Sequence, residues 1–295
     1  MSIFTGSGVA IVTPFNEDMS INFEGLEKLI DFQIDNGTDC IVICGTTGES
    51  STLNDEEHLE CIKVAIDRTN KRVPVIAGTG SNDTAHGIEL SKKARQLGAD
   101  GLLQVTPYYN KTTQKGLIQH FNSIANSVDI PIVLYNVPSR TGLNINADTA
   151  ATLSKTDNII AIKEASGNIA HITDLVHKCE GRLDLYSGND DQIVPLLSLG
   201  GKGVISVVAN ILPKDTHDLV MKFIQGDIKG SLDLQLKMHR LINALFCEVN
   251  PIPVKTALNY MNLPSGPCRL PLTDMEQENA MLLLNEMKNY GINII

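Results

Sequence analysis

The sequence predicts an α/β fold, a closed barrel of eight parallel strands surrounded by helices, with a C-terminal helical extension. Short and nearly continuous apolar runs alternate with longer amphipathic stretches, as in strands buried on both faces and helices that cover them. The runs end roughly 30 residues apart, which is the length of one strand–helix unit. Eight such units occur in series, and eight strands close a (β/α)8 barrel, the TIM-barrel architecture.

The apolar runs give the expected strands, and the amphipathic stretches between them give the expected helices. The expected strands are Gly8–Thr13, Cys40–Cys44, Pro74–Gly78, Gly101–Val105, Pro131–Tyr135, Ile159–Lys163, Leu183–Ser187 and Gly203–Ser206. The helices between them show apolar residues every three or four positions. They include Glu24–Asn36, Glu56–Thr69, Thr84–Leu97, Gln114–Ser127 and Ala147–Lys155. Asn54 before three acidic residues suits a helix start, and Gly37 and Gly98 suit helix ends.

The last 70 residues differ from the repeating part. The eighth unit ends near Gln225, so residues 1–225 are predicted to form the barrel with the active site. Residues 226–295 are predicted to form an extension of three helices, Asp227–Leu245, Pro251–Met261 and Asp274–Tyr290. We expect this extension to pack on the barrel or at a subunit interface, and the sequence leaves that choice open.

Composition excludes several classes of protein. With 295 residues, 42% hydrophobic and 20% charged, the chain can bury a large core, which excludes disorder for its bulk. A formal charge of -10 argues against a general nucleic-acid binder. No apolar run approaches the roughly 20 residues of a membrane helix, and no secretory signal opens the chain. Six scattered cysteines without a CxxC pair predict reduced thiols, so we expect a cytoplasmic protein.

Catalytic residues of such a barrel lie at the C-terminal ends of its strands, and Lys163 ends the sixth. An apolar strand that ends in lysine has two interpretations: an ion-paired or snorkelling side chain, or a Schiff-base amine. Strand alternation places Lys163 on one face with two small residues, which leaves room for a substrate. These are Ala161 and Ala165, whereas Ile160, Ile162 and Glu164 are expected on the other face. Burial in an apolar barrel mouth favours the neutral amine that this chemistry needs.

Three further features are expected near Lys163. Tyr135 ends the preceding strand, so its phenol either shuttles protons or packs at the rim. The loop 45–50, Gly-Thr-Thr-Gly-Glu-Ser, offers backbone N–H groups to a carboxylate or phosphate, although it lacks the lysine of a P-loop. Arg140, on the loop after the fifth strand, either binds a substrate carboxylate or is a solvated loop residue.

No metal or nucleotide motif accompanies these residues. The seven histidines form no HExxH motif, and no cysteine and histidine set has zinc spacing, so no catalytic metal is predicted. The glycines after the third strand lack the spacing of a dinucleotide site, because Asp83 occupies the place of the third glycine.

Three motifs together resemble the pyruvate-dependent Schiff-base lyases and aldolases, and most closely the branch of 4-hydroxy-tetrahydrodipicolinate (dihydrodipicolinate) synthases. They are Gly-Thr-Thr-Gly-Glu at 45–49, Tyr-Asn-Val-Pro-Ser-Arg-Thr-Gly at 135–142 and Lys-Glu-Ala-Ser-Gly at 163–167. The resemblance covers essentially the whole chain. Sister families share the lysine and tyrosine but typically carry Ser-Thr in the first motif and lack the arginine of the second.

The resemblance implies a reaction and a role for each residue. It implies that pyruvate and L-aspartate 4-semialdehyde condense through an imine on Lys163, the first step of the lysine and diaminopimelate branch, with no other cofactor. Tyr135 would relay protons through Thr47 to Tyr109, which reaches across a subunit interface in this family. Thr46 and Thr47 would contact the pyruvate carboxylate, and Arg140 would contact the carboxylate of the aldehyde substrate. Gly188 and Ile205 would line the site with backbone atoms. Homotetramers, dimers of dimers, are usual in the family, and dimers occur.

The resemblance also indicates a possible allosteric lysine site. Positions that bind the inhibitor correspond to Ser50, His58, Asn82 and Tyr108, which fit the pattern. Two positions depart from it: Asp55 stands where a histidine is common, and His86 replaces a glutamate that pairs the inhibitor's ammonium. Losing that charged bond weakens binding roughly ten- to a hundredfold, so we expect weak or absent inhibition by lysine.

Two other functions compete with the synthase. One is another pyruvate-dependent aldolase, of the 2-keto-3-deoxy sugar acid or N-acetylneuraminate lyase type, which Arg140 and the two threonines disfavour. The other is a ligand-sensing barrel without turnover. A sensor needs no imine-forming lysine, so the combination of Lys163 with Tyr135 and Arg140 disfavours it.

Overall fold

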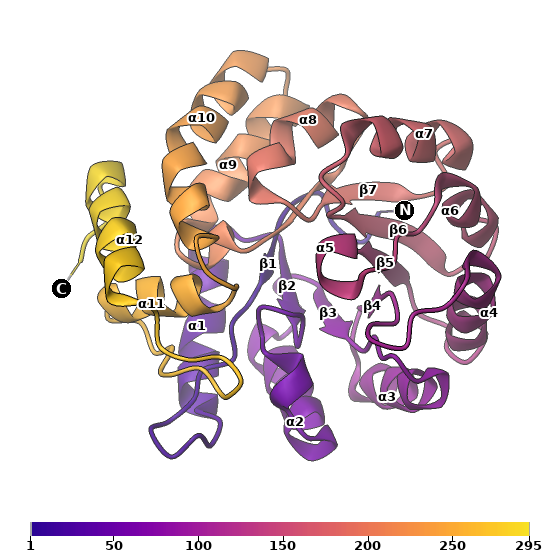
Figure 1. The fold of residues 1–295 in the computed structure, drawn as a ribbon, viewed down its shortest axis with the longest axis horizontal. Coiled ribbons are helices and arrows are strands. Elements are labelled where there is room, and N and C mark those ends of the chain that lie inside the picture. The colour runs from indigo at the N-terminus through magenta and orange to yellow at the C-terminus, as the bar shows by residue number, and fades with distance from the viewer. Residues whose placement is uncertain (1, 295) are drawn as a thin grey trace.

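The computed structural model of the chain describes residues 2–294, in which eight parallel strands form a closed barrel in the order β1 to β8 (Figure 1). The strands are β1 (Gly6–Ala10), β2 (Cys40–Ile43), β3 (Val75–Gly78), β4 (Gly101–Val105), β5 (Ile132–Asn136), β6 (Ile159–Glu164), β7 (Asp184–Ser187) and β8 (Gly203–Ser206). β1 pairs with β8, which closes the sheet. The predicted fold class is confirmed.

Helices surround the barrel. They are α1 (Phe23–Asp35), α2 (Asp55–Thr69), α3 (Thr84–Leu97), α4 (Gln114–Ala125), α5 (Pro138–Thr141), α6 (Ala147–Leu153), α7 (Ile169–Cys179), α8 (Ile193–Ser198), α9 (Pro213–Ile224), α10 (Ile228–Leu245), α11 (Ile252–Tyr260) and α12 (Gln277–Tyr290). Three short 3-10 helices, η1 (Ser50–Thr52), η2 (Asp190–Gln192) and η3 (Val208–Asn210), follow β2, β7 and β8. Asn54 caps α2 in a capping box with Glu57, as the sequence signal indicates.

The first strand differs most from its predicted span. It begins at Gly6, because Gly6 pairs with Gly203 of β8 at very close approach; a Cβ on Gly203 would lie 1.9 Å from the Gly6 carbonyl oxygen. It ends at Ala10, because the Val12 N–H leaves the ladder and donates to Asn210 Oδ1 at 3.2 Å. A side chain 198 residues away therefore determines where this strand stops.

Two apolar clusters divide the core. One fills the barrel interior and includes Phe4, Val42, Ile76, Tyr135 and Ile205. The larger one lies between the strands and the surrounding helices. Strands buried on both sides need apolar residues at nearly every position, which explains the continuous runs in the sequence.

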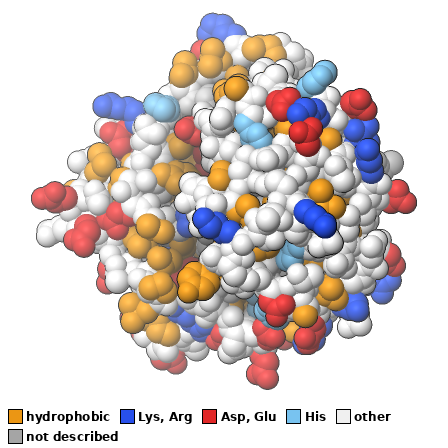
Figure 2. Space-filling model, turned by 45° about the vertical axis from the view of Figure 1, so that its right-hand side comes forward, with side chains coloured by type: hydrophobic (Ala, Val, Ile, Leu, Met, Phe, Trp, Pro, Cys, Tyr) orange, Lys and Arg blue, Asp and Glu red, His pale blue; other side chains and the backbone are white. Residues whose placement is uncertain are grey.

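The C-terminal helices lie at one side of the barrel (Figure 1). α10 packs on α9 and α12 packs on α10, so the extension contacts its own barrel. In the part of the chain that the structure describes, no helix combines the length and the hydropathy needed to cross a membrane. Acidic and basic side chains are interspersed over the face seen in Figure 2, around a hollow bordered by hydrophobic side chains.

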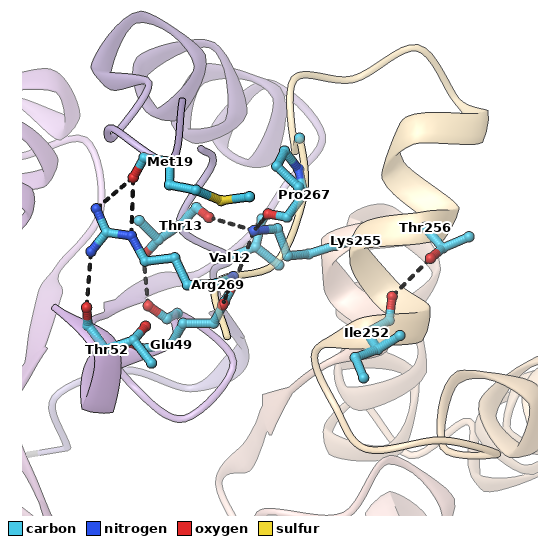
Figure 3. Close-up of polar contacts among 12 residues, drawn as sticks. Val12, Thr13, Met19, Glu49, Thr52, Ile252, Lys255, Thr256, Pro267 and Arg269 are labelled. Carbon is cyan, nitrogen blue, oxygen red and sulfur yellow. Dashed lines mark hydrogen bonds and ion pairs between the residues drawn. The ribbon is translucent and has the colours of Figure 1, made fainter. Parts of the chain in front are cut away.

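A buried ion pair joins the extension to the barrel mouth (Figure 3). Lys255 of α11 is only 1% exposed, and its Nζ donates to Glu49 Oε1 at 2.8 Å, to the Thr13 carbonyl at 3.0 Å and to the Pro267 carbonyl at 2.5 Å. Burial lowers the pKa of Lys255, and the charge of Glu49 opposes this shift. Because all three donors have acceptors, the amine is fully used in holding these segments together.

Arg269 completes the same contact (Figure 3). Its backbone N–H donates to Glu49 Oε2 at 2.9 Å, while its guanidinium donates to the carbonyls of Met19 and Thr52. The same guanidinium bonds both carboxylate oxygens of Glu57 and thereby lowers the pKa of that carboxyl. Glu49, at the end of the loop 45–50, is therefore fixed from two points of the C-terminal extension.

Replacing Lys255 tests how strongly this pair stabilises the fold. In Lys255→Met the Glu49 carboxylate stays buried without its counter-ion, which costs about 3–5 kcal/mol. The free energy of unfolding from denaturant titration should fall by that amount. The double variant Lys255→Met/Glu49→Gln should recover part of the loss, because it buries no unpaired charge.

The control is Lys229→Met, which breaks the exposed pair of Lys229 with Asp233 on α10. Solvent screens that pair, so its loss should leave the unfolding midpoint unchanged. Equal small effects of the Lys255 and Lys229 substitutions would contradict a stabilising role for the buried pair.

Candidate active site

Lys163 lies at the C-terminal end of β6, inside the barrel. It is 5% exposed and stands in register with Tyr135 of β5 on one side and Tyr186 of β7 on the other. Its Nζ is 4.3 Å from the centroid of the Tyr135 ring. The adjacent strand ends thus bring the amine and the phenol-bearing ring together, as their spacing in the sequence predicts.

The two faces of β6 are distinguished by their contacts. Ala161 and Ala165 belong to the interior cluster, on the side of Lys163. Glu164 is on the opposite side, where it accepts hydrogen bonds from Asn136 Nδ2 at 2.8 Å and from the Ser166 N–H at 2.6 Å. Strand alternation predicts both placements, and the carboxylate next to Lys163 in sequence is held away from the amine.

Ile160 is an exception to the predicted alternation. It packs against the interior cluster, not on the face of Ile162. The pairing of β5 with β6 shifts register between Ile132 and Val133, so Ile160 has no direct partner and the alternation restarts at Ala161. The expected placement of Ile160 was wrong for this reason, while that of Lys163 is unaffected.

The position beside the Lys163 stem, which Gly188 occupies, admits only a residue without a side chain. A Cβ on Gly188 would lie 2.7 Å from the Ala165 Cβ and 3.2 Å from the Lys163 Cε. Ile205 of β8 is fully buried in the interior cluster with Tyr135. The structure therefore places Gly188 against the lysine stem and Ile205 within the same barrel interior.

The loop 45–50 forms a tight turn between β2 and η1. The N–H groups of Gly48 and Glu49 donate to the carbonyls of Gly45 and Thr46 at 3.1 Å, and Thr13 Oγ1 donates to the Gly48 carbonyl at 2.7 Å. Within residues 2–294, no hydrogen bond uses the N–H of Thr46 or Thr47. Two adjacent free donors on a fixed turn suit a carboxylate, as the composition of the loop predicts.

Asn250, between α10 and α11, links two of the expected site residues. Its Nδ2 donates to Thr47 Oγ1 at 3.0 Å, and its backbone carbonyl accepts a hydrogen bond from Arg140 Nη2 at 3.2 Å. Arg140 itself lies exposed on α5, which the sequence predicts as a loop; Pro138 starts this short helix. Sequence reasoning missed Asn250, which is more than 200 residues from Thr47.

Tyr109 does not join this cluster within one chain. Its side chain is 95% exposed, and its backbone is left-handed, with φ of 68°. Among residues 2–294, no hydrogen bond connects Thr47 with Tyr135 or Tyr109; the Thr47 hydroxyl is bonded to Asn250. A non-glycine residue in this conformation is strained, and a solvent-exposed aromatic ring gains no contact within the chain that would offset the strain.

Asp190 is a second residue near the lysine that sequence reasoning missed. It is buried, and its Oδ2 accepts the N–H groups of Val207 at 3.0 Å and Val208 at 2.8 Å, which holds the chain after β8. Burial raises the pKa of Asp190, whereas these hydrogen bonds and the Lys163 charge oppose that shift. An acidic residue in the pair Asp190-Asp191 gives no sequence signal that distinguishes it from a solvated loop residue.

Of the residues of the possible lysine site, Ser50 begins η1, and the others make three separate contacts. Asn82 Nδ2 donates to the Tyr108 carbonyl at 3.2 Å. His58 is buried, which lowers its pKa, and its Nε2 donates to the Gly78 carbonyl at 2.7 Å. His86 Nε2 lies 3.0 Å from Asp55 Oδ1. The two residues that depart from the expected pattern, Asp55 and His86, therefore contact each other.

Comparison with known proteins agrees with this geometry. A model of the dihydrodipicolinate synthetase family matches residues 3–289. The chain is 65% identical to a 4-hydroxy-tetrahydrodipicolinate synthase from Lachnoclostridium phytofermentans, over 99% of this chain and 100% of that protein.

Solved structures show the same likeness. A chloride-inhibited dihydrodipicolinate synthase from Acinetobacter baumannii, complexed with pyruvate, is 47% identical, with a TM-score of 0.96 over 98% of this chain and 99% of its own. A DHDPS from Cyanidioschyzon merolae with lysine bound is 39% identical, with a TM-score of 0.97 over 99% of this chain and 100% of its own. With eight strands, a buried lysine on the sixth and relatives matched from end to end, the chain belongs to the dihydrodipicolinate synthetase family.

Proposed function

We propose that this protein condenses pyruvate with L-aspartate 4-semialdehyde to 4-hydroxy-tetrahydrodipicolinate, through a Schiff base on Lys163. As a member of its family the chain is an enzyme of the lyase class. The observation that carries the mechanism is the burial of Lys163 against the Tyr135 ring, among small residues. Small neighbouring residues leave room for a substrate carbon skeleton beside the amine, and lysine amines placed in this way serve as nucleophiles that form Schiff bases.

The proposed reaction uses this placement of the lysine and the tyrosine. Lys163 Nζ attacks C2 of pyruvate, and the former carbonyl oxygen leaves as water to give an iminium. Loss of a proton from C3 then gives an enamine, whose C3 attacks the aldehyde carbon of the second substrate. The amine of that substrate attacks C2, closes the ring and releases Lys163. The Tyr135 phenol, beside the lysine, is the group placed to move protons in these steps.

The two carboxylates of the substrates have separate binding groups. The free N–H groups of Thr46 and Thr47 would hold the carboxylate of pyruvate, and the exposed Arg140 guanidinium that of the semialdehyde. Gly188 leaves space for pyruvate beside the lysine stem. Because the covalent imine carries the chemistry, the proposal includes no metal and no other cofactor.

Trapping the imine tests the mechanism. Borohydride with pyruvate should add one reduced pyruvyl group to the native chain, on the peptide that contains Lys163. Lys163→Ala should form no adduct and should lose at least about a thousandfold in turnover, because the nucleophile itself is gone. Intact-protein and peptide mass spectrometry measure the adduct.

The control for non-specific reduction is Lys229→Met, which removes an exposed lysine of α10 and should still form the adduct. Absence of an adduct on the native chain would contradict the Schiff base. Faster turnover of a 2-keto-3-deoxy sugar acid than of aspartate semialdehyde would leave the imine intact and assign the protein to the aldolase branch.

We further propose that the protein is a homo-oligomer, a dimer of dimers, in which Tyr109 reaches a neighbouring site. The exposed ring on a left-handed backbone supports this, because such a conformation gains its stabilisation from a contact outside the chain. Light scattering should give a tetramer mass. Tyr109→Phe should lower turnover about ten- to a hundredfold at unchanged mass, since it removes only the hydroxyl. A monomer with full activity would contradict the arrangement.

We also propose that lysine inhibits this protein weakly or not at all. In the pocket the Asp55 carboxylate is already bonded to His86, so an incoming ammonium must compete with the imidazole. The exchange variant Asp55→His/His86→Glu restores the arrangement common in inhibited relatives. It should bind lysine roughly ten- to a hundredfold more tightly than the native chain, as measured by calorimetry.

The single variant His86→Ala separates the two contributions. It frees the Asp55 carboxylate without moving it, so it should bind lysine more tightly than the native chain if competition by His86 matters. Half-inhibition of the native enzyme by micromolar or low-millimolar lysine would contradict the proposal.

A further inference from the structure

We infer that Asn250 is a positioning residue that joins the two substrate subsites of this enzyme. Its side-chain amide orients the Thr47 hydroxyl, on the pyruvate side, and its backbone carbonyl holds Arg140, on the side of the second substrate. The inference rests on the proposed function and adds a residue to it. Asn250 comes from the C-terminal extension, outside the eight strand ends that otherwise build the site.

The direction of the hydrogen bond to Thr47 determines what that hydroxyl can do. A threonine hydroxyl has one proton to donate and lone pairs that accept. Asn250 Nδ2 is a donor, so at 3.0 Å it occupies a lone pair of Thr47 Oγ1 and leaves the Thr47 proton free. That proton can then point to a substrate carboxylate or to a phenolate. An acceptor at the same place would instead take the proton away from the site.

The contact with Arg140 fixes a side chain that would otherwise move. Arg140 lies exposed on the short helix α5, and long exposed side chains lose substantial rotamer entropy when a substrate orders them. One Nη2–H donated to the Asn250 carbonyl at 3.2 Å restricts the guanidinium before substrate arrives. The remaining donors stay available for a carboxylate.

The burial of Asn250 indicates that its amide is retained for function. The residue is 4% exposed, and its Oδ1 has no hydrogen-bond partner among the described residues. A buried acceptor without a partner is unfavourable for folding. An apolar residue of similar size would avoid that cost, whereas only a donor provides the bond to Thr47.

The extension that carries Asn250 is itself anchored at the site. Five residues further on, Lys255 bonds Glu49, two residues after Thr47 in the loop 45–50. The same pair of segments is thus joined twice, once through Asn250 and once through the buried ion pair. This double connection sets the distance between the amide and the hydroxyl.

Two substitutions separate positioning from packing. Asn250→Ala removes the donor but keeps the backbone carbonyl, so KM for pyruvate should rise about tenfold while KM for the semialdehyde changes less than threefold. Asn250→Asp keeps the shape but replaces the donor with an acceptor that is charged. It should raise KM for pyruvate more than Asn250→Ala does, and slow borohydride trapping of the pyruvyl adduct in parallel.

A double-mutant cycle that combines Asn250→Ala with Thr47→Val tests whether Asn250 acts through Thr47. In that background Asn250→Ala should change the adduct formation rate less than twofold, against about tenfold in the native background. Asn158→Ala is the matched control. It removes another amide, whose Nδ2 donates to the Ala125 and Val128 carbonyls just before β6 begins, so it should lower the unfolding midpoint and leave both KM values unchanged.

Each outcome assigns the failure to one claim. If native protein forms the adduct and a folded Asn250→Ala or Asn250→Asp keeps its KM for pyruvate within twofold, the inference about Asn250 is wrong and the proposed function stands. An Asn250 effect that persists undiminished in Thr47→Val also overturns it. If Asn250→Ala does not fold, the isosteric Asn250→Asp decides. A native chain that forms no adduct removes the proposed function and this inference with it.

Discussion

The pairing of β5 with β6 is the constraint on which the site depends. Parallel strands in register place Tyr135 directly opposite Lys163, and closure of the barrel turns both side chains into the same interior. The same alternation turns Glu164 away, where Asn136 and Ser166 hold it. The carboxylate that neighbours Lys163 in sequence is therefore held away from its amine, which lies beside the Tyr135 ring. A shift of one residue in this pairing would turn Glu164 into the barrel interior and Lys163 out of it.

The barrel alone does not complete the site. The C-terminal extension contributes Asn250 to the Thr47 hydroxyl and Lys255 to Glu49, and both contacts act on the loop 45–50. The ion pair and the amide both hold the loop whose Thr46 and Thr47 N–H groups donate no hydrogen bond among the described residues. Free N–H groups of this kind suit a carboxylate. In the proposed mechanism the extension is therefore part of the active site, although none of its residues lies at the end of a barrel strand.

Sequence reasoning predicted the features that arise from repeating or local patterns. The spacing of apolar runs predicts the eight strands, the alternation of faces predicts the placement of Lys163, Ala161 and Glu164, and Asn54 marks the start of α2. It failed where contacts between residues distant in the sequence determine the local structure. The end of β1 depends on the amide of Asn210, and the placement of Ile160 depends on a register shift against β5. Asn250 and Lys255 find their partners only after folding, so no pattern near them reveals their contacts.

The central claim is that Lys163 is the residue that bonds covalently to pyruvate. The most direct measurement is a crystal structure of the protein grown in the presence of pyruvate. We expect continuous electron density from Lys163 Nζ to C2 of the bound molecule, with its carboxylate against the N–H groups of Thr46 and Thr47. Unmodified Lys163 with pyruvate bound elsewhere, or held beside it without a covalent bond, would contradict the claim.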